Sequence, residues 1–509
     1  MTNVIEIPRN HNPYATDGVS RDGRGAPRYD VLPRTLLDML RAQADAHPGS
    51  EALVELGRGR LSYRQLWDRA ARVAGGLRDD GLTPGDRVAV RYPAGLDWAL
   101  AFWGTLMAGG IVVAVNTRSA QPEVEYVLSD SGARVDLAPA APLPNGPPHV
   151  TDRLGPSDVA ALFYTSGTTG HPKGVPTTHE AFVTNTENVV RCIDGLGQAG
   201  DGLRTLISVP LFHVTGCNSQ LLAAVRVGGA AVIMPTLDVG CLSAALCVER
   251  ISFMVTVPAI YSLMLRQKDF ADVDVSGVRW VGYGGAPIAP SLVRSIKGAF
   301  PSAAVFNAYG MTETASLMTV LPEAEAIRHA DSVGYAVPSV DLGIIPFAGD
   351  APGVGELVVR GANVATGYWN RPEASSAAIV DGWLHTGDVV RVDDAGRVHI
   401  VDRLKDIINR GGENISSVAV EAALLAAPNV ADACVVAVPD EVMGEKVGAV
   451  LCGEGIDVNA VIDHCRAQLA DYEVPQYVTV VATALPRNAG GKLLKGVIRE
   501  QVRWGNALR

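Results

Sequence analysis

Short apolar runs alternate with stretches of helical periodicity from about Leu36 onward, and this alternation constrains the fold more than any other feature. Such runs are typical of strands that are buried on both faces. Strands that alternate with helices favour parallel sheets covered by helices. Pro258 follows one run directly, where a proline can begin a helix. The segments predicted as strands are residues 88–90, 111–115, 159–164, 206–209, 230–234, 253–257 and 278–283, and residues 98–107 are predicted as a helix.

The chain of 509 residues is too long for one hydrophobic core, so at least two domains are expected. We predict a large N-terminal α/β domain with helix-covered sheets over residues 1–403. Within it, residues 1–32 read as an extended polar arm, residues 138–150 as a proline-rich loop, and residues 389–401 as a hairpin around the turn Asp393-Asp394-Ala395-Gly396. After Arg403 the pattern becomes strand, helix, strand, strand, helix, strand, which predicts a small α+β domain over residues 404–509.

Composition excludes several classes of protein. Apolar residues make up 48% of the chain and charged residues 19%, as in globular proteins, and the net charge of −11 gives no electrostatic support to a nucleic-acid partner. No apolar run is long enough for a membrane span, and the first residues lack the pattern of a signal peptide. The seven cysteines form no Cys-x-x-Cys pair, which argues against zinc and favours a reduced, cytoplasmic setting.

Residues 164–174 combine four serine and threonine hydroxyls, three glycines and one lysine. Such a loop can place backbone N–H groups and hydroxyls along a chain of phosphates, and Lys173 adds a point charge. An apolar run precedes it, and residues 177–180 read as a capping box that opens a helix. The expected order is therefore strand, phosphate loop, helix. It is not the common P-loop, and a plain turn would need neither this length nor the lysine.

The segments that follow this loop resemble, in order, the adenylate-forming superfamily of acyl- and aryl-CoA synthetases, luciferases and peptide-synthetase adenylation domains. The chain is most similar to a bacterial acyl-CoA ligase. The matching segments are residues 164–174, 210–216, 283–287, 307–314, 353–356, 383–388, 402–406, 439–440, 444–445 and 485–492.

The resemblance implies a reaction in two steps. A carboxylate attacks the α-phosphorus of ATP and gives an acyl-adenylate and pyrophosphate, and the thiol of CoA then takes the acyl group and releases AMP. Mg²⁺ is the implied cofactor, because phosphoryl chemistry depends on positioning and charge stabilisation. The small C-terminal domain is expected to be mobile, with a hinge near Lys405. On the residues alone, Lys405 is only a solvated lysine.

The resemblance also assigns the nucleotide site. Asp388 and Arg403 are expected at the ribose hydroxyls, and Tyr309 against adenine with residues 285–287 as the opposite wall. The full set expected to bind ATP or AMP is Thr165, Ser166, Gly167, Thr168, Thr169, Gly170, Lys173, Gly284, Gly285, Ala286, Pro287, Asn307, Ala308, Tyr309, Gly310, Met311, Thr312, Asp388, Arg403 and Lys492.

Four residues are expected to be catalytic: Lys492, His213, Glu313 and Lys173. By resemblance, Lys492 bridges the carboxylate and the α-phosphate, and Glu313 binds magnesium together with Thr168. Carboxylate and phosphate oxygens are ligands that Mg²⁺ prefers. On the residues alone, Glu313 could equally be a helix cap or a surface glutamate, and His213 a structural histidine.

The acyl pocket is expected at His213, Val214, Thr215, Gly216, Cys217, Tyr283, Gly284, Gly310 and Ala315. Small residues are frequent in this set, which suggests room for a bulky or long acyl group. Residues 210–216 contain no aspartate to pair with a substrate ammonium, which favours an acid without an α-amino group. Fatty, aryl and polycyclic acids all remain open.

The second half-reaction needs a path for the thiol, and residues 409–414 resemble the loop that serves it, with Gly411 and Gly412 at CoA. The resemblance weakens over residues 416–421, where relatives often carry an aromatic residue, proline and two glutamates. Ser417 can still cap the helix expected there.

Three alternatives stand beside the CoA ligase. The chain could load a carrier-protein thiol as an acyl-AMP ligase or adenylation domain, it could be a luciferase-like oxygenase, or it could be a non-catalytic nucleotide-binding protein. The presence of Lys173, Glu313, Asp388 and Lys492 together argues against the last. The expected partners are a small carboxylic acid, ATP and CoA, and either a monomer or a homodimer fits the sequence.

Overall fold

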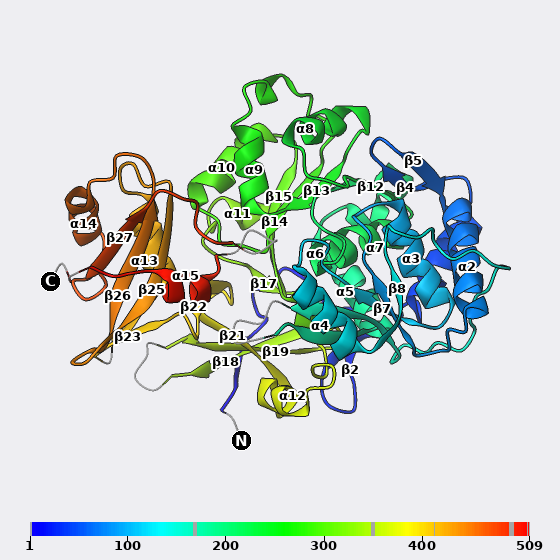
Figure 1. The fold of residues 1–509 in the computed structure, drawn as a ribbon, viewed down its shortest axis with the longest axis horizontal. Helices are drawn as coiled ribbons and strands as arrows, with labels where there is room; N and C mark the ends of the chain where they lie inside the picture. Colours follow the sequence, from blue (N-terminus) through cyan, green and yellow to red (C-terminus); the bar gives the residue numbers. More distant parts are fainter. Residues whose placement is uncertain are drawn as a thin grey trace.

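The computed structural model describes residues 3–165, 171–347, 352–411, 413–487, 493–505 and 507. The described strands form a nine-stranded sheet, a six-stranded sheet, two five-stranded sheets and one two-stranded pair, with helices packed among them, and the elements from residue 408 onward gather at one end of the molecule (Figure 1). This agrees with the predicted α/β class with an added C-terminal α+β part. Among the described helices, none is both long and apolar enough to cross a membrane.

The largest sheet has nine strands, and its central six run parallel. Apolar runs form this centre because helices cover it and most of its positions are buried. In order across the sheet, the strands are β17 (Tyr335–Ala336), β16 (Thr319–Leu321), β15 (Ala304–Tyr309), β14 (Trp280–Gly284), β13 (Phe253–Thr256), β11 (Arg204–Ile207), β12 (Ala230–Ile233), β4 (Glu51–Glu55) and β5 (Gly59–Ser62).

The second sheet has five strands, of which only β10 is antiparallel to its neighbour. Its order is β10 (Lys173–Thr178), β9 (Val159–Thr165), β7 (Ile111–Ala114), β6 (Arg87–Val90) and β8 (Ala133–Leu137).

An antiparallel sheet of six strands follows in the chain. It contains β1 (Ile5–Glu6), β18 (Val340–Pro346), β19 (Val354–Gly361), β21 (Trp383–Val392), β20 (Ile379–Val380) and β22 (Val398–Arg403), and a separate pair joins β2 (Val19–Arg21) to β3 (Pro27–Tyr29). The predicted hairpin is present as β21 and β22. Asp393 accepts the N–H groups of Ala395 and Arg397 in its turn.

The C-terminal sheet has five strands and its own hydrophobic core, separate from the main core. Its strands are β24 (Glu413–Ile415), β23 (Ile408–Arg410), β26 (Gly444–Cys452), β25 (Asp432–Asp440) and β27 (Tyr477–Val481). The helices of the chain are α1 (Leu36–Ala46), α2 (Tyr63–Asp79), α3 (Leu96–Met107), α4 (Gln121–Ser131), α5 (His179–Cys192), α6 (Val214–Gly216), α7 (Leu222–Val227), α8 (Val239–Val248), α9 (Pro258–Leu265), α10 (Pro290–Ala299), α11 (Glu323–Ala326), α12 (Pro372–Ala378), α13 (Ser417–Leu425), α14 (Val458–Arg466) and α15 (Lys495–Gln501).

Three local predictions need correction. The order strand, loop, helix after residue 159 omitted β10, which pairs antiparallel with β9 before α5 begins. The cap of α5 is Thr178, which accepts the Ala181 N–H, and not a box closed by Glu180. Likewise Ser416, not Ser417, caps α13.

The N-terminal arm is also more ordered than its polar composition predicts. It contributes β1 to the antiparallel sheet, and the guanidinium of Arg9 donates hydrogen bonds to the carbonyls of Val337, Val340 and Ala336. Long-range contacts of this kind leave no periodic pattern in a sequence.

Candidate active site

The carboxyl ends of β14 and β15 gather several residues singled out from the sequence. The two strands run parallel, and Tyr283 pairs with Asn307 and Gly284 with Ala308 in their register. Glu313 follows β15 within a 3-10 turn, Thr312–Thr314. In open α/β sheets, ligands bind outside the carboxyl ends of the strands. The segments 283–287 and 307–314 therefore share one edge of the largest sheet.

Asp388 meets Tyr309 and Arg403 at this edge. Asp388 and Arg403 are opposite each other in β21 and β22, and Arg403 Nε lies 2.5 Å from Asp388 Oδ1. The Tyr309 hydroxyl donates to the other carboxylate oxygen. The side chain of Asp388 is only 4% exposed, so its two partners compensate a buried charge. Burial and the Asp388 charge raise the pKa of Tyr309, which keeps its hydroxyl a donor.

Glu356 stabilises the residues directly before Asp388. One of its carboxylate oxygens lies 2.9 Å from His385 Nδ1, and the other accepts the Gly387 N–H at 3.2 Å. Gly387 has a φ of 68°, the left-handed region that favours glycine. The segments 353–356 and 383–388, matched separately in the sequence, are thus parts of one support for the carboxylate.

Glu313 forms a second polar cluster with Tyr368 and Lys173. The Tyr368 hydroxyl donates to Glu313 Oε1 at 2.9 Å, and Lys173 Nζ lies 4.9 Å from the centre of the Tyr368 ring. Burial raises the pKa of the Glu313 carboxyl, although the Tyr368 hydrogen bond and the charges of Arg403 and Lys173 oppose it. A cation placed beside Glu313 would favour the ionised carboxylate and so offset the effect of burial on its pKa.

The donor set at Glu313 fits a magnesium ion that is held mainly by substrate phosphates. Among the described residues, no group of three or more His, Cys, Asp or Glu side chains could hold a metal ion. Mg²⁺ is usually bound through one or two carboxylates together with phosphate oxygens, and not by an all-protein cage. A single buried carboxylate beside a lysine matches that mode of binding.

His213 is held as a neutral imidazole. Burial and the nearby charge of Arg118 lower its pKa to about 4. Its Nε2 atom is buried, and it has no hydrogen-bond partner within the described part of the chain. His213 also ends the loop before α6, where its carbonyl accepts the Cys217 N–H. The ring therefore offers an unpaired, uncharged polar atom.

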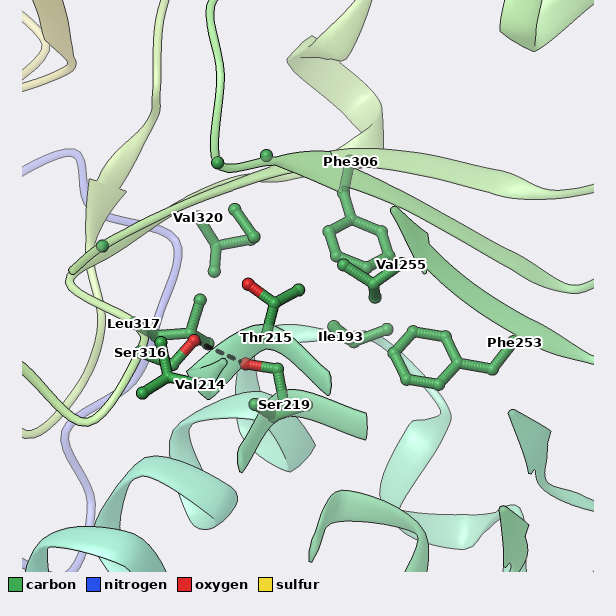
Figure 2. A pocket seen from close by; sticks show the side chains of 15 residues that line it. Ile193, Val214, Thr215, Ser219, Phe253, Val255, Phe306, Ser316, Leu317 and Val320 are labelled. Atoms are coloured by element: carbon green, nitrogen blue, oxygen red, sulfur yellow. Dashed lines mark hydrogen bonds between the residues drawn. The ribbon is translucent and has the colours of Figure 1, made fainter. Parts of the chain in front are cut away.

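An apolar pocket lies beside these clusters, and Figure 2 shows it from close by. Phe253, Phe306, Val255 and Ile193 gather on one side, and a hydrogen bond of 2.8 Å joins Ser219 and Ser316 on the other (Figure 2). Among the described residues, the lining carries no charged side chain; it consists of Val189, Ile193, Val214, Thr215, Ser219, Phe253, Val255, Gly284, Gly285, Phe306, Ala308, Gly310, Ser316, Leu317 and Val320.

Two glycines of this lining are fixed by the backbone opposite them. A Cβ atom on Gly310 would lie 1.4 Å from the Ser316 carbonyl oxygen, and one on Gly284 would lie 2.1 Å from the Ala308 carbonyl oxygen. Real Cβ atoms do not approach backbone so closely. Any side chain at either position would have to displace the main chain.

The predicted acyl residues divide into two groups. Val214, Thr215, Gly284 and Gly310 line the pocket, whereas His213, Gly216, Cys217, Tyr283 and Ala315 are not among its lining residues. The pocket encloses about 50 Å³, which is space for roughly three to five water molecules. The pocket is narrower than the small residues in the sequence suggested, because the rings of Phe253 and Phe306 also line it. The sequence did not show which face of their strands these two side chains occupy.

Two further polar atoms near this edge have no partner in the described part of the structure. These are the Asn307 side-chain oxygen and the Tyr283 hydroxyl, both buried. Buried polar atoms are nearly always hydrogen-bonded, so unpaired ones beside a pocket indicate sites that a ligand can satisfy.

Several predicted residues lie outside the described residues: Ser166, Gly167, Thr168, Thr169, Gly170, Gly412 and Lys492. Their flanks are placed. Thr165 ends β9, and its register partner Lys173 begins β10. Gly411 lies between β23 and β24 with a φ of 63°. Lys405 is exposed between β22 and β23.

Sequence reasoning missed three kinds of residue in this site. Tyr368, on Glu313, stands in a Gly-aromatic stretch that carried no periodic signal. Phe253 was read only as a strand residue, and Phe306 was not singled out. Three buried asparagines also hold the loop after Glu313: Asn218 and Asn185 bond Ala315 and Leu317, and Asn363 bonds the carbonyls of Thr314 and Leu317. Nothing in the order of motifs marks them.

Comparison with known proteins gives the following similarities. The family profile described as AMP-binding enzyme matches residues 40–145 and 136–369, and the profile described as AMP-binding enzyme C-terminal domain matches residues 419–492. The long-chain-fatty-acid–CoA ligase FadD13 of Mycobacterium tuberculosis is 34% identical over 498 residues, which span 91% of this chain and 97% of that protein. Feruloyl-CoA synthase of an Amycolatopsis species is 35% identical over 469 residues, 87% of this chain and 94% of that protein.

Among solved structures, o-succinylbenzoate CoA synthetase of Bacillus subtilis is similar in two complexes. The complex with its acyl-adenylate intermediate superposes with a TM-score of 0.84 at 26% identity and covers 92% of this chain and 99% of that one. The complex with ATP and a magnesium ion has a TM-score of 0.81 at 27% identity and covers 91% and 98%.

Proposed function

Since this chain belongs to the family of AMP-binding enzymes, we infer that it is an ATP-dependent acyl-CoA ligase. It activates a carboxylic acid as an acyl-adenylate with loss of pyrophosphate, and it then transfers the acyl group to CoA with release of AMP. ATP and CoA are its substrates and Mg²⁺ its cofactor.

One observation carries the assignment to this site. The short segment from Tyr309 to Glu313 connects the Asp388–Arg403 pair, the Glu313–Tyr368–Lys173 cluster and the apolar pocket. Besides its adenine, an acyl-adenylate contains a ribose with hydroxyls, a phosphate and an acyl group. The three protein groups offer a polar pair for the ribose, a carboxylate and a lysine for the phosphate and its metal ion, and an apolar lining for the acyl group.

We assign roles to the site residues on that basis. The Asp388 carboxylate accepts hydrogen bonds from the ribose hydroxyls, and Arg403 orients that carboxylate. Asn307, with its unpaired side-chain oxygen, accepts from the exocyclic amine of adenine. Glu313 holds Mg²⁺, which when bound neutralises charge on the phosphates. Lys173, which begins β10, binds the phosphates together with residues 165–170.

Adenylation then depends on charge placement. The neutral imidazole of His213 meets the substrate carboxylate, because a buried ring with a pKa of about 4 can donate one hydrogen bond without a net charge. Lys492 bridges the attacking carboxylate oxygen and the α-phosphate. A preorganised donor of this kind contributes about 3–4 kcal/mol to the transition state.

Thioester formation uses the small domain. We propose the boundary after residue 403, with Lys405 as the hinge, because the segment there is an exposed turn whose Asp406 and Ile407 N–H groups bond the Arg403 carbonyl. Gly411 and Gly412 allow CoA to approach the backbone closely.

The acid itself is proposed to be a fatty, aryl or polycyclic carboxylic acid. The described lining is uncharged, so it favours an acyl group without an ionised tail. A compact aryl or short fatty acyl group requires the least rearrangement of Phe253 and Phe306. A long or polycyclic group requires these rings to move.

Mass spectrometry of the products tests this function. The protein is incubated with ATP, Mg²⁺, CoA and a panel of decanoate, palmitate, benzoate, ferulate and cholate. Acyl-CoA and AMP are expected with at least one acid. Acyl-adenylate without thioester would favour a carrier-protein thiol as acceptor, and absence of both products and of ATP binding would contradict the proposal.

The setting of the enzyme is also a proposal. A cytoplasmic location fits its substrates ATP and CoA and its seven unpaired cysteines. A monomer or homodimer fits as well, and sedimentation would distinguish them.

A further inference from the structure

A buried polar network joins three segments that are far apart in the sequence: the end of β22, the start of α13 and the start of α15. Its members are Asp402, Ser417, Glu421 and Lys495. Ser417 is fully buried and Asp402 is 2% exposed. A network so deeply buried forms only where nearly every donor and acceptor is matched.

Ser417 is the centre of the network. Its backbone N–H and its hydroxyl both donate to Asp402 Oδ2, at 2.5 and 2.7 Å. The same hydroxyl oxygen accepts a hydrogen bond of 2.6 Å from the ammonium of Lys495. The Ser417 hydroxyl therefore links the Asp402 carboxylate to the Lys495 ammonium through two hydrogen bonds.

Lys495 is fixed further by an ion pair within the C-terminal part. Its Nζ lies 2.8 Å from Glu421 Oε1, and both side chains are 13% exposed. The same oxygen of Glu421 accepts the Val435 N–H of β25. A charged group held by two short contacts at this depth has little freedom to move.

The network ends at two places that matter for the proposed reaction. Asp402 immediately precedes Arg403, the partner of Asp388. Lys495 follows Leu493 and Leu494, which come directly after the segment that contains Lys492. Leu493 forms a bridge with Arg487, and the Leu494 N–H donates a hydrogen bond of 2.9 Å to the Pro486 carbonyl.

We propose that Lys495 is a positioning residue for adenylation, which through Ser417 and Asp402 fixes the residues that flank the Lys492 segment to the strand that carries Arg403. The inference rests on the proposed function, in which Lys492 acts only in the first half-reaction. A misplacement of about 1 Å in a catalytic group can lower a rate about 100-fold, so loosening the residues that flank Lys492 affects the step that needs Lys492. In the proposed function, thioester formation from a supplied acyl-adenylate does not need Lys492.

Lys495→Met tests the inference in the full-length enzyme, with both half-reactions measured separately. Adenylation is followed as pyrophosphate release with the most active acid of the panel, and thioester formation as acyl-CoA from the purified acyl-adenylate and CoA. We expect adenylation to fall about 10- to 100-fold and thioester formation less than about threefold. Lys495→Arg, which keeps the charge, should recover most of the adenylation rate.

Two further variants complete the test. Arg466→Met removes an exposed ion pair with Asp463 on α14, in the same part of the chain but away from the network, and it should change neither half-reaction. Ser417→Ala keeps the backbone bond to Asp402 and the Lys495–Glu421 pair. Ser417→Ala should lower the adenylation rate by about 3- to 10-fold and leave thioester formation unchanged. If Lys495→Met does not fold, Ser417→Ala alone serves as the test.

The outcomes separate the inference from the function on which it rests. Equal loss of both half-reactions, or no loss of either, in a folded Lys495 or Ser417 variant would overturn the positioning role while the wild-type enzyme stays active. A wild-type enzyme that releases no pyrophosphate with any acid would overturn the proposed function, and this inference with it.

Discussion

The Tyr368 hydroxyl donates a hydrogen bond of 2.9 Å to the Glu313 carboxylate, while the ring of the same tyrosine lies 4.9 Å from the Lys173 ammonium. One aromatic side chain thus contacts both the proposed metal ligand and the proposed phosphate-binding cation. The two functions of Tyr368 can be separated, because phenylalanine keeps the ring and removes only the hydroxyl.

Tyr368→Phe should weaken the response to magnesium. The hydrogen bond lowers the pKa of Glu313, so its loss makes the carboxylate harder to ionise. We expect the Mg²⁺ concentration for half-maximal pyrophosphate release to rise about tenfold. Tyr335→Phe removes a similar hydrogen bond to Glu325 outside the site and serves as the control. An unchanged magnesium titration would show that Glu313 does not depend on Tyr368.

Lys492→Ala should abolish the first half-reaction selectively. Loss of a preorganised donor of about 3–4 kcal/mol corresponds to a decrease of about 100- to 1000-fold in adenylation. Conversion of supplied acyl-adenylate to acyl-CoA should be largely retained. Single-turnover assays of each half-reaction check the expectation, and a parallel decline of the two would contradict the division of labour.

Acid should destabilise the fold through buried histidines. His179 is 1% exposed, and burial lowers its pKa from 6.5 to about 4, against the opposing charges of Asp158 and Asp38. Between these pH values the unfolded state binds a proton that the folded state does not, so stability is full above pH 6.5 and falls as the pH drops toward 4.

The size of this effect follows from the shift. At pH 5 His179 should reduce the free energy of unfolding by about 2 kcal/mol relative to pH 7, and His213 adds a loss in the same direction. Urea denaturation at both pH values measures the difference. In His179→Gln, the difference in free energy of unfolding between pH 7 and pH 5 should be smaller by about 2 kcal/mol, the contribution of His179. A wild-type stability that does not change between pH 7 and 5 would refute the linkage.

Phe306→Ala should widen the acyl pocket. A shorter side chain removes one of the two rings that limit it, and each methylene accommodated in a hydrophobic pocket contributes about 1–3 kcal/mol to discrimination. We expect the ratio of kcat/KM for palmitate over decanoate to rise about tenfold or more. Phe300→Ala truncates a core phenylalanine outside the pocket and controls for lost stability. A similar ratio in both variants would mean that Phe306 does not limit chain length.

Local pattern was enough to predict most of the parallel strands, although β4, β8 and β15 were not predicted. Runs such as Phe253–Thr256 and Ala230–Ile233 are buried along their whole length, so their composition alone identifies them. Strand β10 was missed for the opposite reason. It contains Pro176 and lies at the edge of its sheet, where a proline removes no ladder bond that the fold needs.

The site was predictable only as far as its motifs reach. The segments holding Asp388, Arg403, Tyr309 and Glu313 could be named, and the structure places them at one sheet edge. Their direct partners could not be derived, because the contact of Tyr368 with Glu313 spans 55 residues and depends on the packing of several sheets. The facing of Phe253 and Phe306 was equally inaccessible, since strands buried on both sides show no alternation.

The pocket lining contains two positions that cannot accept another residue and several that can. At Gly284 and Gly310 the opposing main chain leaves no room for even a methyl group, and both glycines adjoin the segment that is proposed to bind the nucleotide. The lining also includes Phe253, Phe306, Val255 and Ile193, whose side chains gather together (Figure 2). Substitutions at these four side chains, in evolution or by design, can therefore change which acid such an enzyme selects. They leave the two glycines, and the nucleotide segment beside them, unchanged.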